Sequence, residues 1–346
     1  MNSFKITILG AQNSGKTCYM YAMYKIMSEG RDGFTFTACQ PYSLELDKDA
    51  HNELLKGWQI ISQKKEWVPG TIGSGKNYNF SFNYAGKSLI SFEYLDYRGS
   101  ALKDGKDSKD YQTLLSNLSN SQVIMWCVPG QYWKDQDEDE YSNIDLEISN
   151  INALLADLKS KRDKDKKPVP PVILLITKYD QCKNVPSDNL QRLIKSKLNI
   201  LFTKEGDWLV TIMKSTLGFD LSEFDNDLEK ATIKPKWIME PIAFAIYFVF
   251  EQLKKAFSED ISYHSREADR YKGSFLGIKD WWFSEEIEHH ELREKKASDE
   301  IDFIKKYAPL VKETFFPKDS AYFYFKGKKL KLEQLESLIS GNKTDM

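Results

Sequence analysis

The sequence contains few cysteines and no long apolar run. Its longest uninterrupted apolar stretch, residues 242–250, has nine residues, whereas a membrane-spanning helix needs about 20. We therefore expect no transmembrane segment, with a helix lying on a membrane surface as the alternative for this stretch. The four cysteines, which show no metal-binding spacing, are Cys18, Cys39, Cys127 and Cys182. With no secretory signal before the first expected strand, they indicate reduced side chains of a cytoplasmic protein.

The chain also has no excess of charge of either sign. Its 49 Lys and Arg residues nearly balance its 51 Asp and Glu residues, which leaves a net charge of −2. Without a general basic field, we expect no nucleic-acid partner. By contrast, 41% of the residues are hydrophobic and 13% are aromatic, which supports a substantial core. The chain of 346 residues can hold one large α/β domain and an appendage of about 90 residues.

The most informative motif is at residues 10–17, which read G-A-Q-N-S-G-K-T and match the P-loop pattern G-x-x-x-x-G-K-T. An apolar strand precedes the motif, and a helical pattern begins near Lys16. Such a loop points backbone N–H groups at phosphate oxygens, and the start of the helix adds a positive dipole end. Lys16 is expected to reach the β- and γ-phosphates, and Thr17 to bind Mg²⁺. The other predicted phosphate-side residues are Gly10, Asn13, Ser14, Gly15 and Cys18.

A second motif follows an antiparallel hairpin predicted from residues 77–84 and 88–95. The second strand of the hairpin runs into D-Y-R-G at residues 96–99, a D-x-x-G sequence. Asp96, at the end of a buried strand, can hold Mg²⁺ directly or through water. The backbone N–H of Gly99 can touch the γ-phosphate and so respond to its presence.

The third and fourth motifs indicate guanine. Residues 172–176 form a continuous apolar strand that ends in T-K-Y-D. Asp180 can accept hydrogen bonds from the guanine N1–H and its exocyclic amine, groups that adenine lacks, and the stem of Lys178 can lie along the base. A further strand, residues 208–213, leads to S-T-L-G at residues 215–218, a loop whose backbone can bind the guanine O6. The predicted base-side residues are Thr177, Lys178, Asp180, Ser215 and Thr216.

With these four motifs in order, the chain resembles a G domain of the translation-factor and Ras-like class of P-loop GTPases. Within that class, W-V-P-G-T at residues 67–71, together with residues 96–99, is similar to prokaryotic double-GTPase proteins of bacterial conflict or signalling gene sets. The resemblance implies an α/β fold with a mostly parallel six-stranded sheet flanked by helices. It also implies that GTP or GDP binds with Mg²⁺ at the carboxyl ends of the strands.

The resemblance assigns a switch threonine that closes on Mg²⁺ when GTP is bound. Thr71 is the candidate because it lies in a glycine-rich segment shortly before the hairpin, while Thr35 and Thr37 compete from a predicted short strand. Many relatives carry glutamine after D-x-x-G to orient the attacking water, but this chain has Ser100. We therefore expect slow hydrolysis, completed by a group from a protein partner or a second GTPase copy. The predicted catalytic residues are Lys16, Thr71, Gly99 and Ser100, and the predicted metal ligands are Thr17, Thr71 and Asp96.

Composition divides the chain into a GTP-binding domain over residues 1–257 and a mainly helical extension with a hairpin over residues 258–346. The domain includes a long switch-I insertion at residues 31–76, partly helical, and ends in a helix over residues 236–257. In the extension, W-W-F at residues 281–283 either docks on the domain or anchors a partner.

Three functions compete at this point. The first is a GTP-hydrolysing molecular switch. The second is a nucleotide-binding scaffold with negligible hydrolysis, which Ser100 favours and the intact Lys16, Thr17 and Asp96 disfavour. The third is an ATPase or kinase, which Lys178 and Asp180 argue against.

Overall fold

The computed structural model describes most of the chain, in two compact units. The described residues are 4–69, 76–96, 106–133, 138–272, 284–316 and 321–340. Unit 1 comprises Met1–Ile242 and Pro317–Leu330, and unit 2 comprises Ala243–Phe316 and Lys331–Met346. The domain boundary at residue 257 stays a prediction.

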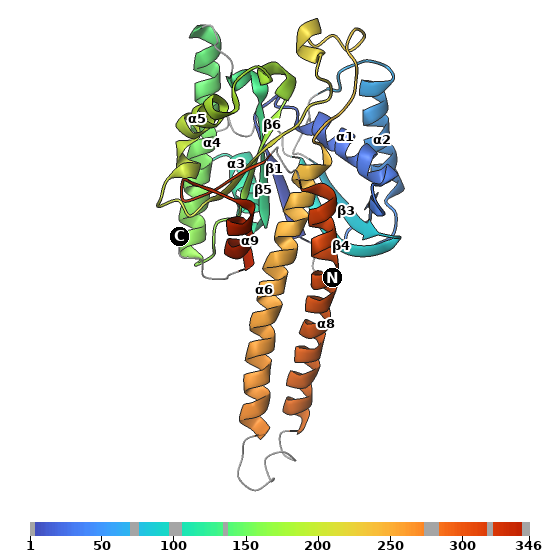
Figure 1. Ribbon diagram of the computed structural model, residues 1–346, viewed down its shortest axis with the longest axis vertical. Helices are drawn as coiled ribbons and strands as arrows, with labels where there is room; N and C mark the ends of the chain where they lie inside the picture. The colour runs from blue at the N-terminus through green and yellow to red at the C-terminus, as the bar shows by residue number, and fades with distance from the viewer. Residues whose placement is uncertain are drawn as a thin grey trace. The chain divides into compact units, whose positions relative to one another are not determined.

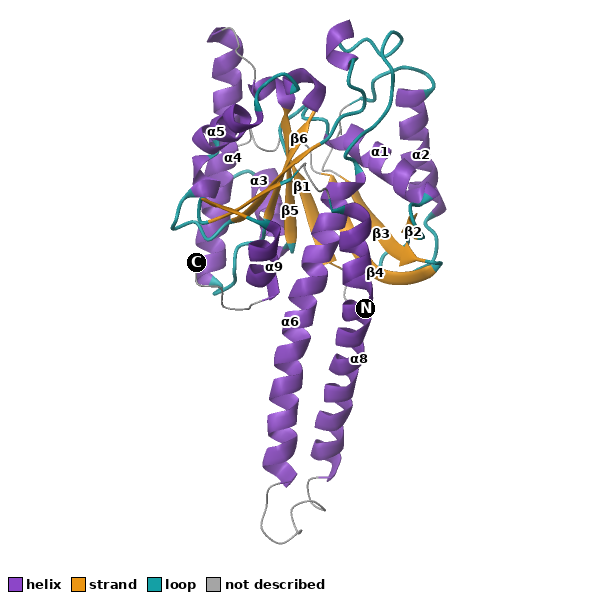
Figure 2. Cartoon of the chain, viewed as in Figure 1, coloured by secondary structure: helices purple, strands orange, loops and turns teal. Residues whose placement is uncertain are grey.

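A nine-stranded sheet organises unit 1 (Figures 1 and 2). Its strands, in spatial order, are β2 (Phe34–Ala38), β3 (Lys76–Tyr84), β4 (Lys87–Asp96), β1 (Phe4–Leu9), β5 (Val123–Pro129), β6 (Val172–Thr177), β7 (Leu209–Lys214), β8 (Tyr322–Phe325) and β9 (Lys328–Leu330). The five neighbours from β4 to β7 are mutually parallel, and the other pairs are antiparallel. The predicted α/β fold with a large sheet flanked by helices is therefore confirmed, but the predicted six-stranded, mostly parallel sheet is wrong.

The additional strands lie at the two edges of the sheet. At one edge, β2 pairs with β3, and the rings of Phe34 and Phe36 lie 5.2 Å and 5.4 Å from that of Phe82. At the other edge, β8 and β9 form the hairpin predicted for the C-terminal extension, but β8 pairs with β7 and so extends the sheet. An open edge strand leaves backbone N–H and C=O groups unpaired. The additional strands are favoured because they form hydrogen bonds with these groups.

The central strands read as continuous apolar runs because both of their faces are buried. Every residue of β5 and of β6 is buried. Large side chains fill the core beside them, including Trp126 on β5 and Trp208 before β7, each 2% exposed or less.

The described helices of unit 1 flank this sheet (Figure 2). They are α1 (Lys16–Glu29), α2 (Lys48–Ser62), α3 (Lys109–Asn120), α4 (Glu138–Lys164) and α5 (Ser187–Lys197), with short 3-10 turns η2 (Gly130–Trp133), η3 (Tyr179–Cys182), η4 (Asn199–Phe202) and η5 (Leu221–Phe224). Side-chain caps fix two of the starts. Asp47 accepts hydrogen bonds from the backbone N–H groups of Asp49 and Ala50, and Ser108 accepts one from that of Tyr111. Such caps typically stabilise a helix by about 1 kcal/mol.

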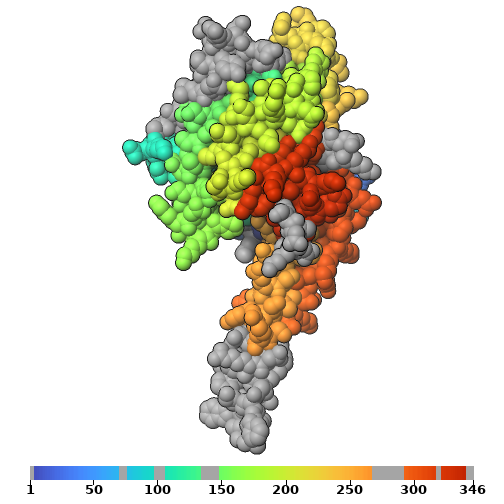
Figure 3. Space-filling view, turned by 60° about the vertical axis from the view of Figure 1, so that its left-hand side comes forward, coloured from blue at the N-terminus to red at the C-terminus, as the bar shows by residue number. Residues whose placement is uncertain are grey.

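The C-terminal hairpin also packs on α5, as the red and yellow-green surfaces in Figure 3 show. The Tyr324 hydroxyl donates to the Gln191 side-chain oxygen at 2.6 Å, and Lys329 donates to the same oxygen at 2.9 Å. Lys195 on α5 donates to the carbonyl of Gly327 at 3.3 Å. Residues from the end of the sequence are thus built into the same sheet layer as the motifs at its start.

Helices make up the described part of unit 2. They are α6 (Met239–Lys272), whose first residues belong to unit 1, α8 (Ser284–Phe315) and α9 (Leu332–Ser340). The helix predicted over residues 236–257 thus begins later and continues further. The ring of Phe316 lies 5.4 Å from that of Phe244 and 4.8 Å from that of Tyr247, which joins the start of α6 to the end of α8. Residues 281–283 lie outside the described residues. No helix in the described ranges has the length and apolar character to cross a bilayer.

Candidate functional site

Three of the predicted motifs, and Asp96 of the fourth, lie at the carboxyl ends of the parallel strands. These strands are β1, β4, β6 and β7, four members of the parallel set. Because parallel strands all run in the same direction, the loops that follow them become neighbours although they lie far apart in the sequence. The carboxyl ends of the strands are the usual binding sites of open α/β sheets.

Glycine is required at the start of the phosphate-side loop. Gly10 has a φ of 153°, and a Cβ atom on it would lie 2.6 Å from Ser14 Oγ and 2.7 Å from the carbonyl oxygen of Cys127. Gly15 (φ 85°) and Asn13 (φ 64°) also adopt left-handed backbone conformations. These conformations, which most residues disfavour, curl the loop tightly between β1 and α1.

The side chain of Lys16 lies inside this loop. Its ammonium donates to the carbonyl oxygens of Gly10 at 2.8 Å and Ala11 at 2.7 Å, and to Ser14 Oγ at 3.3 Å. Lys16 is only 6% exposed. The predicted loop residues are therefore brought together around one buried positive charge.

Thr17 and Asp96 come together from α1 and β4. The Thr17 hydroxyl donates to Asp96 Oδ2 at 3.2 Å, and Asp96 is 2% exposed. A hydroxyl and a carboxylate are hard oxygen ligands of the kind that Mg²⁺ prefers, so this pair fits the ion. Within the described ranges no three His, Cys, Asp or Glu side chains gather to hold a metal. The predicted residues Thr71, Gly99 and Ser100 lie outside the described residues.

The competing switch threonines have partners in the sheet. Thr35 and Thr37 lie on β2, as predicted for that segment. The side-chain nitrogen of Asn83 donates to Thr37 Oγ1 at 3.1 Å and lies 3.5 Å from Thr35 Oγ1. Both hydroxyls thus contribute to the pairing of β2 with β3.

The base-side residues occupy two neighbouring loops that also touch the phosphate side. The Thr177 hydroxyl donates to the carbonyl of Ser14 at 2.6 Å, which ties the end of β6 to the phosphate-side loop. The backbone N–H of Tyr179 donates to the carbonyl of Ser215 at 3.1 Å, and the Thr216 hydroxyl lies 2.9 Å from Asp180 Oδ1. The two base-side loops are therefore held to each other and to the phosphate-side loop.

One oxygen of Asp180 has no partner in the described protein. Asp180 is 3% exposed, and its Oδ2 is buried without a hydrogen bond to any described residue. Burial raises the pKa of this carboxyl above its ordinary value, while the hydrogen bond with Thr216 opposes the shift. An unsatisfied buried polar atom costs about 1–3 kcal/mol, so this oxygen is suited to a ligand that brings its own N–H donors.

Lys178 interacts electrostatically with Asp180 and with Cys18. Burial lowers the pKa of Lys178, and the Asp180 carboxylate opposes that shift. Burial raises the pKa of the Cys18 thiol to about 11, so the thiol is neutral at neutral pH. The neutral thiol leaves the backbone N–H as the group of Cys18 suited to phosphate.

The sequence patterns did not identify Ser222 and Asn226, which contact the base-side motif. The Ser222 hydroxyl donates to the backbone carbonyl of Asp180 at 3.2 Å. The side-chain nitrogen of Gln181 donates to Asn226 Oδ1 at 3.3 Å. The only relevant signal in the sequence is the D-N pair at residues 225–226, because Asp and Asn favour left-handed turns.

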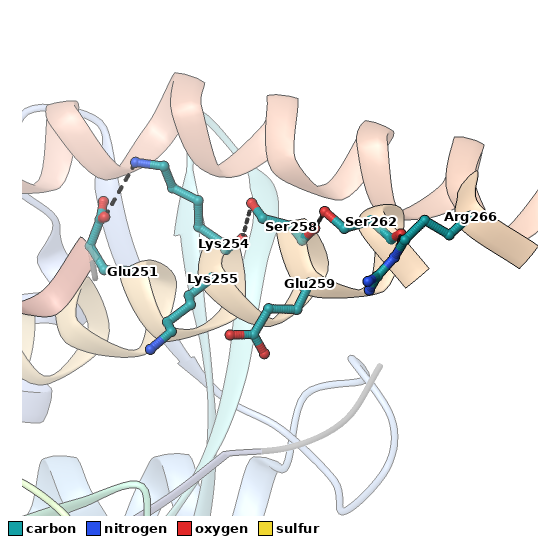
Figure 4. Close-up of a pocket in the computed structure, with 7 residues that line it drawn as sticks. All are labelled: Glu251, Lys254, Lys255, Ser258, Glu259, Ser262 and Arg266. Atoms are coloured by element: carbon teal, nitrogen blue, oxygen red, sulfur yellow. Dashed lines mark hydrogen bonds and ion pairs between the residues drawn. The ribbon is translucent and has the colours of Figure 1, made fainter. Parts of the chain in front are cut away.

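A separate hollow lies along α6 in unit 2 (Figure 4). Seven residues of that helix line it: Glu251, Lys254, Lys255, Ser258, Glu259, Ser262 and Arg266. Lys254 pairs with Glu251 at 3.3 Å, and Ser258, Ser262 and Arg266 each bond a carbonyl one turn back. Five of its seven side chains therefore have partners on α6 itself, and none of the predicted site residues lines it.

Fold and loops together define a protein of the P-loop GTPase class. The family model described as Double-GTPase 2 matches residues 5–212, and the chain belongs to this family. The double-GTPase resemblance drawn from the motifs is thus confirmed.

The chain also shows a distant similarity to a solved GTPase-like domain. The GTPase-like domain of S. cerevisiae Ski7, solved bound to GTP, is 15% identical with a TM-score of 0.37. The match covers 62% of this chain and 42% of that one, so the chain spans less than half of that protein's length. No curated protein matches the chain.

Proposed function

We propose that this protein binds GTP and GDP with Mg²⁺ and acts as a slowly hydrolysing molecular switch for a protein partner. The observation that carries the proposal is the buried Asp180 carboxylate, whose Oδ2 lacks a described partner while Thr216 holds Oδ1. Guanine presents two adjacent N–H donors to such a carboxylate. Adenine presents an acceptor at the equivalent ring nitrogen and would be repelled.

The positions of the other residues at the carboxyl ends of the strands suggest their roles. Lys16 and the loop N–H groups would bind phosphate oxygens, because the ammonium lies within the curled loop. Thr17 and Asp96 would hold Mg²⁺, which when bound neutralises phosphate charge. Thr71, Gly99 and Ser100 keep their predicted roles near the γ-phosphate, and the cytoplasmic location stays a prediction.

Slow hydrolysis follows from the residue after the D-x-x-G motif. A serine side chain is too short to orient water as glutamine does, so Ser100 leaves the site without its usual water-positioning group. A protein partner or a second GTPase copy would supply the missing group. Ser100 also favours a second function, a scaffold that binds GTP or GDP without turnover in a bacterial signalling or defence complex.

Turnover of purified protein tests the switch. Phosphate release from GTP and from ATP is measured with Mg²⁺ for the wild type, Lys16→Ala and Ser100→Gln. We expect slow release from GTP alone, a loss of at least about tenfold in Lys16→Ala, equivalent to ~1.4 kcal/mol, and faster release in Ser100→Gln. GTP binding without any turnover would establish the scaffold instead. Equal turnover of ATP would contradict both functions.

A further inference from the structure

One loop touches both the base-side motif and the insertion between α1 and β3. We call residues 217–233, which follow the S-T motif, the bridging segment. It contains the 3-10 turn η5 and lies within unit 1, as do both regions that it touches.

On one side, the bridging segment holds the base-side motif. The Ser222 hydroxyl donates to the carbonyl of Asp180 at 3.2 Å, and Lys183 donates to the carbonyl of Phe219 at 2.8 Å. Gln181, the residue after Asp180, donates to Asn226 Oδ1 at 3.3 Å. A change at Asp180 therefore has direct hydrogen-bonded routes into the segment.

On the other side, the segment holds the end of the insertion. The indole N–H of Trp67 donates to the carbonyl of Asn226 at 3.0 Å, and Lys65 donates to that of Ala231 at 3.4 Å. A small hydrophobic core joins the same two regions, and its buried members are Ile61, Leu221, Leu228 and Ala231. Partly buried residues packed against it include Cys18 and Tyr21 on α1 and Val68 beside Trp67.

Asn226 is the residue where the two sides meet. Its side-chain oxygen accepts from Gln181, and its backbone carbonyl accepts from Trp67. It has a φ of 63°, directly after Asp225 at 51°, two consecutive left-handed residues. Asparagine tolerates this conformation better than most residues, so the tight turn that presents both acceptors suits it.

We propose that Asn226 is a positioning residue that couples guanine contact at Asp180 to the position of Trp67. The inference rests on the proposed function, because it takes Asp180 as the base contact. When the base binds the carboxylate, the Asp180 loop shifts together with Gln181 and the bonded Ser222. Asn226, which bonds both Gln181 and Trp67, then shifts the position of the indole. Thr71 follows shortly after Trp67 in the sequence. The nucleotide would therefore influence this stretch from its base end, without any contact from the γ-phosphate.

Fluorescence of Trp67 tests the coupling. Trp67 is 45% exposed, so its emission responds to small changes in its surroundings. The chain has eight tryptophans, so the Trp67 signal is the difference between the wild type and Trp67→Phe. GDP is the probe because it carries the base but no γ-phosphate, and calorimetry measures its binding to every variant. Because Trp237 lies 5.6 Å from the ring of Tyr179 beside Asp180, we expect GDP to change the emission in both proteins, and by more in the wild type than in Trp67→Phe.

Two variants of Asn226 assign the signal to the bridging segment. Asn226→Gly keeps the left-handed backbone and the carbonyl but removes Oδ1, and Asn226→Asp keeps an oxygen acceptor at that place. In Asn226→Gly the Trp67 signal should fall by at least about half, the smaller end of the effects seen along coupling networks, and Asn226→Asp should restore it. An undiminished Trp67 signal in Asn226→Gly, or no Trp67 signal in a wild type that binds GDP, would overturn the coupling alone. Absence of GDP binding by calorimetry would overturn the proposed function as well.

Discussion

At the scale of single residues, the phosphate-side loop tolerates few substitutions, because side chains hydrogen-bond to its backbone carbonyls. Lys16 uses three acceptors within the loop, and Thr177 bonds the carbonyl of Ser14 from across the sheet edge. Sequence motifs could predict these residues because the phosphate chemistry dictates their types and spacing. Motifs could not predict Ser222 or Asn226, whose roles depend on how a long loop folds back over the motif.

Gly10→Ala tests whether the loop needs its close approach. The added Cβ would meet Ser14 Oγ and the Cys127 carbonyl well inside contact distance, so we expect a loss of about 1–3 kcal/mol beyond backbone strain. Gly86→Ala is the control, because Gly86 also has a positive φ, 77°, but open space around it. Urea unfolding of both variants measures the difference, and equal losses would show that the contact is unimportant.

The raised pKa of Asp180 predicts opposite pH trends for binding and stability. Below the raised pKa the carboxyl is protonated and loses acceptor capacity for guanine, so GDP affinity should fall as the pH drops from neutral through that value. Burial of the charge is unfavourable, so the contribution of Asp180 to folding stability is largest below its ordinary unfolded pKa and is lost as the pH rises through the raised value. Asp180→Asn, which does not titrate, should lack that stability trend. Stability that varies with pH alike in both proteins would refute the assignment.

At the scale of elements, the sequence predicted strands and the two hairpins, β3 with β4 and β8 with β9, but not the pairing of β8 with β7. Apolar runs and alternating aromatics identified the segments that became β3, β4, β6 and β7, because burial on one or two faces leaves a direct pattern. The same patterns cannot say that the last hairpin pairs with β7, since that choice depends on an open edge elsewhere in the chain. Helices α3 and α5 gave no recognised signal. Both are short and polar, with few buried positions each.

The contact between α1 and α2 gives a prediction for Gly57. A Cβ there would lie 2.4 Å from the ring of Tyr21, and the overpacking cost of about 1–3 kcal/mol should outweigh the roughly 1 kcal/mol that alanine adds to helix propensity. Gly57→Ala should therefore destabilise the wild type. In a Tyr21→Ala background the same change should stabilise, because the ring is gone. Thermal unfolding of the four proteins measures whether Gly57→Ala raises or lowers stability in each background. Stabilisation in both backgrounds would contradict the prediction, because it would show that α1 and α2 can move apart to accommodate the methyl group.

At the scale of the whole molecule, the end of the sequence completes the sheet of the first unit. Residues 317–330 group with Met1–Ile242, although a long helical stretch separates them in the sequence. A match over residues 5–212 therefore leaves out two strands of the nine. Composition placed those strands in the extension because composition carries no information on long-range pairing.

A fragment of residues 1–257 tests this arrangement. It retains all four motifs but lacks β8 and β9, so β7 becomes an open edge strand with unpaired backbone groups. We expect lower thermal stability and greater aggregation than in the full chain, measured by unfolding and light scattering. A fragment as stable and monodisperse as the full chain would show that the hairpin contributes little to the sheet.

Guanine selectivity is the central claim, and calorimetry tests it most directly. GDP, a non-hydrolysable GTP analogue and ATP are titrated with Mg²⁺ into the wild type and Asp180→Ala. The account predicts that both guanine nucleotides bind the wild type, that ATP does not, and that the variant weakens guanine binding by at least about tenfold, as loss of a charged hydrogen bond worth about 1.5–3 kcal/mol requires. Equal binding of ATP, or guanine binding that survives in Asp180→Ala, would contradict it.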